Sequence, residues 1–143
     1  MSYNIEKELK NSINKFELGG EVVQIDKIYR NRIGIGSLRF CLRQNIYGND
    51  QVVPIVLKGS LVDTYGNKIQ KGDWISVKGT IITYERQIMR NGKKIDEYEE
   101  VIVMFGFEIV DKTNNKVYKS DGQVQELSND DEIERWKDMS MKY

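Results

Sequence analysis

Alternation of hydrophobic and polar side chains recurs through most of the chain, and this two-residue period limits the possible folds more than any other feature. It is clearest at residues 37–43, Ser-Leu-Arg-Phe-Cys-Leu-Arg. A strand with one face on a core and the other facing outward produces this period, whereas a helix repeats every ~3.6 residues. The expected inward positions are Leu38, Phe40 and Leu42, and the expected outward positions are Ser37, Arg39, Cys41 and Arg43.

Five strand-like segments follow one another between Asn14 and Asp111. They span residues 16–29, 33–43, 51–58, 74–84 and 98–110. Residues 60–70 are predicted to form a short helix or turn, and residues 86–97 a polar hairpin around Asn91-Gly92. This order describes an all-β, five-stranded oligonucleotide/oligosaccharide-binding barrel, the OB-fold, with its helix between strands three and four and a long hairpin between strands four and five. Another small barrel or an open sheet is the alternative.

Two glycine-containing stretches predict where strands bend or turn. Gly19-Gly20 lies inside the first segment, where glycine often marks the bulge or bend that a small barrel needs to close. Residues 47–50, Tyr-Gly-Asn-Asp, separate the second segment from the third and are predicted to be a turn. In the fourth segment, Ile75 and Val77 are expected to face the core.

The two ends of the chain lack the strand pattern. Ile5, Leu9 and Ile13 recur every four residues, which predicts a short helix or a loose arm. Near the other end, Ser128 is expected to cap a helix that carries acidic residues and Trp136. The predicted divisions are an N-terminal arm at 1–13, the OB-fold domain at 14–111, and a polar linker followed by an acidic, partly helical tail at 112–143.

The residue types that most enzymes rely on are scarce. The chain has no histidine and one cysteine, Cys41, so histidine-based dyads and triads and the usual zinc sites cannot be built. We therefore expect a protein that is not an enzyme, with no catalytic residue, metal or cofactor. No apolar run approaches the ~20 residues of a membrane span, and the start does not resemble a signal peptide. These features predict a cytoplasmic protein that does not enter membranes.

Charge is unevenly distributed although the net charge is zero. Residues 1–94 contain 16 Lys or Arg and 9 Asp or Glu, and residues 95–143 contain 6 and 13. A basic body with an acidic end favours a nucleic-acid surface and a separate acidic tail. The plainer interpretation is a solvated surface with uneven spacing.

The outward positions of the strands combine cations with aromatic rings. Single-stranded nucleic acid is held by such surfaces, because cations follow the phosphates and bases stack on flat side chains. Arg86, counted also on its strand, forms with Arg90, Lys93 and Lys94 a set of four cations near Asn91-Gly92. This set fits one of the two loops with which OB-folds grip their ligand, and a solubilising loop is the alternative. The candidate binding residues are Arg39, Arg43, Lys58, Trp74, Lys78, Tyr84 and Arg86 on the strands, and Arg90, Lys93 and Lys94 in the hairpin. For Trp74, packing in an interface is as well supported as stacking.

Three runs carry a resemblance to a known family. Residues 53–59 read Val-Pro-Ile-Val-Leu-Lys-Gly, residues 71–79 read Lys-Gly-Asp-Trp-Ile-Ser-Val-Lys-Gly, and residues 100–103 read Glu-Val-Ile-Val. Their order and spacing resemble those of bacterial single-stranded DNA-binding proteins. The resemblance implies a role in DNA replication, recombination or repair, and a homo-oligomer, a tetramer or, as in primosomal relatives, a dimer. It also implies a binding face that bears Lys58, Trp74, Lys78 and Arg86.

The chain departs from the family pattern at two places. Lys58 and Arg86 stand where the family often has aromatic residues, so charge is expected to matter more than stacking. The chain ends Met-Ser-Met-Lys-Tyr instead of an acidic tip with apolar residues, so recruitment of a protein partner through the tail is open. The leading hypothesis is non-sequence-specific binding of single-stranded DNA. The alternatives are an OB domain that binds protein in a larger assembly, and binding of single-stranded RNA.

Overall fold

Each of the five predicted segments forms a strand, with boundaries shifted by a few residues. The structure, a computed structural model, describes residues 12–127. The elements are β1 (Phe16–Ile25), β2 (Tyr29–Arg30), β3 (Gly36–Ile46), β4 (Asn49–Lys58), α2 (Ser60–Tyr65), β5 (Trp74–Arg90), β6 (Lys93–Asp111), β7 (Lys116–Lys119) and β8 (Val124–Glu126). The all-β prediction and the helix between the third and fourth predicted strands are confirmed.

Five strands close into a barrel. β1 pairs with β3 and with β5, β3 pairs with β4, and β5 pairs with β6, all antiparallel. A parallel contact between β4 and β6, with Val56 opposite Phe105, closes the ring. The order around the barrel is therefore β1-β3-β4-β6-β5, and the prediction of an OB-like barrel is confirmed.

The predicted alternation correctly locates the core. Ile75 and Val77 are buried as expected, and so are the three inward residues of the 37–43 run. The largest buried side chains of the barrel strands are Val22, Leu38, Phe40, Leu42, Ile55, Leu57, Ile75, Val77 and Ile109. Leu61, Val62 and Tyr65 of α2 belong to the same core. The helix therefore covers one end of the barrel, as the hydrophobic face of a short helix requires.

One outward prediction on β3 is wrong. Cys41 is 4% exposed although its neighbours Arg39 and Arg43 on the same side of the strand are exposed. Its cross-strand partners are Gln24 on β1 and Pro54 on β4. A small side chain between larger ones on both sides is covered by them. Strand parity therefore predicts direction but not exposure where residue sizes differ.

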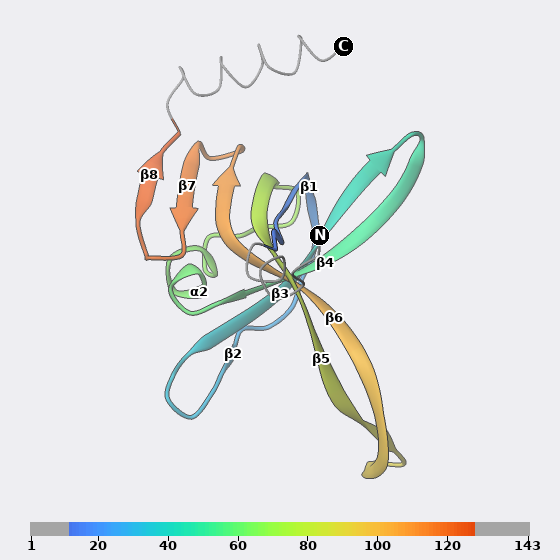
Figure 1. Cartoon of the computed structure of the whole chain (residues 1–143). Coiled ribbons are helices and arrows are strands. Elements are labelled where there is room, and N and C mark those ends of the chain that lie inside the picture. The colour runs from blue at the N-terminus through green and yellow to red at the C-terminus, as the bar shows by residue number, and fades with distance from the viewer. Residues whose placement is uncertain (1–11, 128–143) are drawn as a thin grey trace, which may run out of the picture.

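The two longest hairpins extend from the barrel as arms (Figure 1). β3 and β4 turn at Tyr47 and Gly48, whose φ angles are 51° and 82°. β5 and β6 turn at Asn91 and Gly92, with φ angles of 52° and 78°. Positive φ at both central residues is typical of tight type I′ hairpin turns, which match the strand twist. Residues 86–97 therefore form the predicted hairpin, and its strands continue to the tip. We call residues 80–106 the ribbon.

The bend expected at Gly19-Gly20 lies a few residues further along. The pairing of β1 with β3 shifts between Val22 and Gln24, and β1 ends at Ile25 rather than at residue 29. Gly20 has another purpose, because a Cβ there would lie 2.5 Å from the carbonyl oxygen of Arg43. The two strands thus approach too closely for any side chain at this position.

The segment predicted to be a linker is ordered into strands. β7 pairs with the end of β6, and β8 pairs with β7, which extends the sheet beyond the barrel. Tyr118 of β7 packs on Tyr65 of α2, with ring centroids 4.8 Å apart. The predicted arm, apart from Ser12 and Ile13, and the predicted helix from Ser128 lie outside the described residues.

Candidate nucleic-acid interface

The outer wall formed by β3 and β4 holds two of the predicted cations together. Arg39 lies opposite Val56, and Ser37 lies opposite Lys58. Directly opposite residues of a ladder point to the same face. Arg39 and Lys58 therefore share one solvent-facing wall, as the sequence predicts. In OB-folds this wall and the two connections beside it form the ligand-binding surface.

The base of the ribbon faces this wall across a groove of about 420 Å³. The barrel contributes Arg39 and Val56, and the ribbon contributes Tyr84 and Arg86. The remaining lining residues are Pro54, Val101, Ile102, Val103 and Met104. The structure thus joins four outward side chains, three of them predicted, from strands that lie far apart in the sequence. We call this the ribbon groove.

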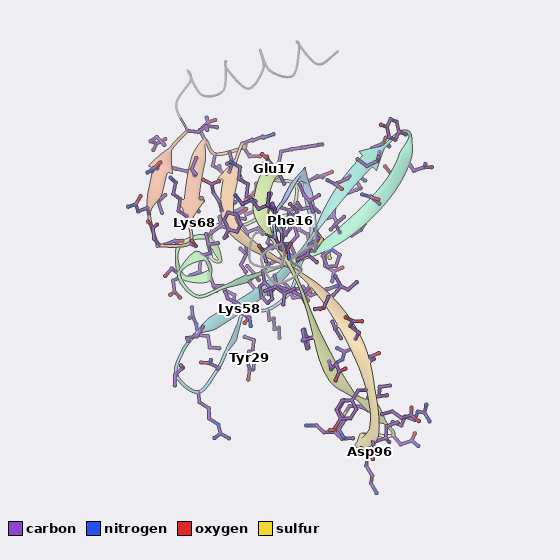
Figure 2. All side chains as sticks on the ribbon, viewed as in Figure 1. Phe16, Glu17, Tyr29, Lys58, Lys68 and Asp96 are labelled. Carbon is purple, nitrogen blue, oxygen red and sulfur yellow. The ribbon has the colours of Figure 1, made fainter. Side chains whose placement is uncertain are left out.

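Sequence reasoning missed two aromatic residues on the wall that bears Lys58. Tyr29 of β2 lies opposite Ser37, in the same row as Lys58, and is 68% exposed. Phe105 of β6 lies under Lys58, with Nζ 4.9 Å from the ring centroid. Figure 2 shows Tyr29 and Lys58 on the same side of the barrel. The sequence did offer one indication for Tyr29. It lies in the connection between the first two barrel strands, and OB-folds use this connection for binding.

The arginines of the ribbon groove are paired with carboxylates of the chain. Arg39 Nη1 lies 3.3 Å from Asp26, and Arg86 Nε donates to Glu99 over 2.9 Å. A hydrogen bond from Gln24, together with Arg39, lowers the pKa of Asp26, and Glu99 raises the pKa of Arg86. A phosphate that binds either arginine exchanges one anionic partner for another. These two residues therefore contribute less net attraction than unpaired cations do.

The ribbon is less basic than its hairpin tip suggests. Residues 80–106 carry four cations and five carboxylates. Arg90 pairs with Glu97 at 3.4 Å, whereas Lys93 and Lys94 have no carboxylate within ion-pair distance among residues 12–127. Asp96, labelled in Figure 2, lies near the same end of the ribbon. Of the four hairpin cations predicted to bind the ligand, only the two lysines at the tip are thus without a carboxylate partner among residues 12–127.

Lys78 does not share the wall of Arg39 and Lys58. It lies on β5, which is separated from β3 by β1 and from β4 by β6. Its register partners are Glu17 and Glu108, and its Nζ lies 3.5 Å from the Glu108 carboxylate. The expectation of a single wall bearing all three cations is therefore wrong for Lys78, because strand parity cannot tell which side of a barrel a strand occupies.

Trp74 and Arg43 lie together, apart from the ribbon groove. They line a second hollow of about 470 Å³ with Gly19 and Gly20. Trp74 is 57% exposed, and Arg43 pairs with Glu21 of β1 at 2.9 Å. The ladder explains the grouping, because Glu21 lies opposite Trp74 on one side and Arg43 on the other. We call this the Trp74 hollow.

Comparisons with known proteins found no match that assigns a function to this site. No protein-family model matches the chain, and no curated protein matches it either. Within residues 12–127, no group of three or more acidic, cysteine or histidine side chains is arranged to hold a metal ion. The same part of the chain contains no helix long and apolar enough to cross a membrane.

Proposed function

We propose that this protein binds single-stranded DNA without sequence specificity, through the β3–β4 wall and the ribbon groove. The observation that carries the proposal is the grouping of cations with exposed rings on the wall that OB-folds use. Tyr29 lies in the same cross-strand row as Lys58, with Ser37 between them, and Arg86 stands beside Tyr84. Phosphates would contact the cations, and bases would stack on the tyrosines, which accept any base because every base has a π-face.

The family resemblance supports a place for this binding in DNA replication, recombination or repair. It rests on the order of the runs at residues 53–59, 71–79 and 100–103. The barrel order is compatible with it but is shared by other OB-folds. Single-stranded RNA is the competing ligand for the same wall. Competition between DNA and RNA oligonucleotides of matched sequence separates the two ligands.

A fluorescence titration with oligo-dT at two salt concentrations tests the proposal. We expect tight binding at low salt and a linear fall of log K with log salt, because bound phosphates release counterions. Changing Arg39, Lys58 and Arg86 together to alanine should flatten the slope by about 2, at roughly 0.7 per phosphate contact on a single strand. Lys78→Ala is the matched control and should bind as the wild type does. Absence of binding at low salt, or binding insensitive to salt, contradicts the proposal.

The ribbon also supports a second role, association with another copy of this chain. Its back face bears Ile81, Met104 and Ile102, and Ile102 is 70% exposed in the single chain. Its other face bears Ile82 and Tyr84, which are also exposed. A two-stranded ribbon is marginally stable alone in water, and a contiguous exposed apolar face typically marks an interface. We propose that the back face contacts a second protomer while the face bearing Tyr84 and Arg86 serves the ribbon groove, although Ile102 and Met104 of the back face also border that groove.

A further inference from the structure

Strand β3 connects the ribbon groove to the Trp74 hollow. Its outward positions run from Arg39, which lines the groove, to Arg43, which lines the hollow. Arg43 is four positions beyond Arg39, which corresponds to about 13 Å along a strand. Cys41 lies between them and is 4% exposed because its cross-strand neighbours Gln24 and Pro54 cover it, so a ligand would pass over these two side chains, and Pro54 itself lines the ribbon groove. One extended ligand can therefore contact both places along the same strand.

The floor of the Trp74 hollow is suited to a flat group. Gly19 and Gly20 contribute main chain only, and Gly20 cannot be replaced because of its closeness to Arg43. Trp74 borders this floor and exposes more than half of its surface. One side chain reaches this floor, because Gln44 Nε2 donates to the Gly19 carbonyl oxygen over 3.0 Å. A large ring beside main chain and one amide group leaves room for a second ring to stack.

The charge of the hollow differs from that of the ribbon groove. Arg43 is paired with Glu21, and Asp50 also lines the hollow. Two carboxylates therefore stand against one cation, so attraction of phosphates is weak here. A nucleic-acid strand would gain from the hollow mainly by stacking of a base, which depends little on salt.

We propose that the Trp74 hollow is a second base-stacking subsite for the same single strand that occupies the ribbon groove, reached along the outer face of β3. The inference rests on the proposed function and extends it. It assigns phosphate contacts to the Lys58 end of the wall and stacking without phosphate contact to the Trp74 end. Short oligonucleotides occupy the ribbon groove alone, and longer ones reach both places.

Alanine substitution separates the two kinds of contact. Trp74→Ala should weaken binding of a long oligo-dT about 5-fold to 150-fold, the range expected for loss of one stacking ring. The slope of log K against log salt should stay as in the wild type, because no phosphate contact is lost. Tyr47→Ala is the matched control: Tyr47 is fully exposed at the tip of the β3–β4 hairpin and lines neither hollow, so its loss should leave binding unchanged.

A length series gives a readout specific to Trp74. The chain has two tryptophans, so Trp136→Phe leaves Trp74 as the only indole fluorophore. Oligo-dT from about 4 to about 16 nucleotides covers the site sizes of single OB-folds. We expect quenching of Trp74 to appear only above a threshold length, and the effect of Trp74→Ala to appear at the same length.

The outcomes distinguish the subsite from the proposed function. If the wild type binds no oligo-dT at any length, the proposed function fails and the subsite fails with it. If the wild type binds with salt dependence but Trp74→Ala binds equally at every length, the function stands and the subsite is wrong. A folded Trp74→Ala variant with a flattened salt slope also overturns the subsite, because Trp74 would then act by holding Arg43 for a phosphate.

Discussion

At the scale of single residues, one buried hydroxyl departs from the usual pairing of polar atoms. Tyr65 is fully buried, and its hydroxyl has no hydrogen-bond partner. Burial, reinforced by the negative charges of Asp111 and Asp73, raises its pKa far above the ordinary tyrosine value of 10.0. Burial also raises the pKa of the neighbouring Tyr118. The packed tyrosine pair therefore resists ionisation in the folded state.

Tyr65→Phe should flatten the loss of stability at alkaline pH. In the unfolded chain Tyr65 ionises above pH 10.0, while in the fold it stays protonated. The unfolded state then binds fewer protons, so the free energy of unfolding falls as pH rises above 10, by about 1.4 kcal/mol per pH unit for one group. Below pH 10 Tyr65 is protonated in both states, so its contribution to the free energy of unfolding does not change with pH. Urea titrations between pH 7 and pH 11.5 measure this.

The variant should be as stable as the wild type at pH 7, or more stable, because the hydroxyl forms no hydrogen bond that could be lost. Tyr118 retains its own alkaline dependence in both proteins. Identical slopes of stability against pH above pH 10 for the two proteins would show that the Tyr65 hydroxyl is solvated in the fold.

At the scale of elements, the ribbon depends on the point where it leaves the barrel. The pairing of β5 with β6 shifts between Lys78 and Gly79, which leaves Phe107 as an extra residue on β6. Such a bulge bends and twists a strand pair and changes the direction of the residues beyond it. At this point Gly79 lies against the ring of Phe16 and the main chain of β6. The bulge and the glycine together direct the ribbon that carries Tyr84 and Arg86.

Gly79→Ala should destabilise the protein by about 3 kcal/mol, the upper part of the range for overpacked sites. A Cβ there would lie 2.0 Å from the carbonyl oxygen of Phe105 and 2.4 Å from the Phe16 ring. Gly19→Ala is the matched control on β1, where the nearest atom would be 3.8 Å away, and should change stability by less than about 0.5 kcal/mol. Equal unfolding free energies for both variants, measured with urea, would mean that the backbone at the base of the ribbon shifts to accommodate the added methyl group at no cost in stability.

At the scale of the whole molecule, the proposed association through the ribbon predicts a particle larger than one chain. Native mass measurement at micromolar concentration should give a multiple of 16.7 kDa. Ile102→Glu should reduce it to the monomer, because a charge would be buried without a partner. Val124→Glu on β8, another apolar strand position that is 48% exposed, should leave the assembly intact. A wild-type mass of one chain at this concentration rules out this interface.

Much of the fold was predictable because local chemistry specifies it. Leu38, Phe40 and Leu42 alternate with polar neighbours, and a strand of that pattern has only one way to bury its apolar face. Asn91-Gly92 tolerates positive φ at both positions, so the hairpin tip was predictable to the residue. The strand ends were less predictable, because β5 and β6 continue into polar sequence where their mutual pairing, and not a core, supports them.

The candidate site was predictable only in part. Arg39 and Lys58 were grouped correctly because two neighbouring strands of one hairpin share their faces. Lys78 was misplaced and Phe105 was missed because their positions depend on pairing between segments far apart in the chain, whereas Tyr29 was missed because it was assigned to the end of the first strand and not to β2, which pairs with β3. The carboxylate partners of Arg39 and Arg86 were also missed, although each is only 13 residues away and Glu99 lies directly opposite Arg86 across the predicted hairpin.

The sequence alone determined which side chains face inward, where the hairpins turn and which segments are strands, since each of these depends on interactions between near neighbours in the chain. The tertiary structure alone decided which outward side chains meet. Closure of the barrel brings β6 beside β4 and carries Lys78 to another wall, and the bulge at Gly79 sets the direction of the ribbon that brings Tyr84 and Arg86 to the groove. A binding surface is a property of that closure, because it joins residues that no local pattern relates.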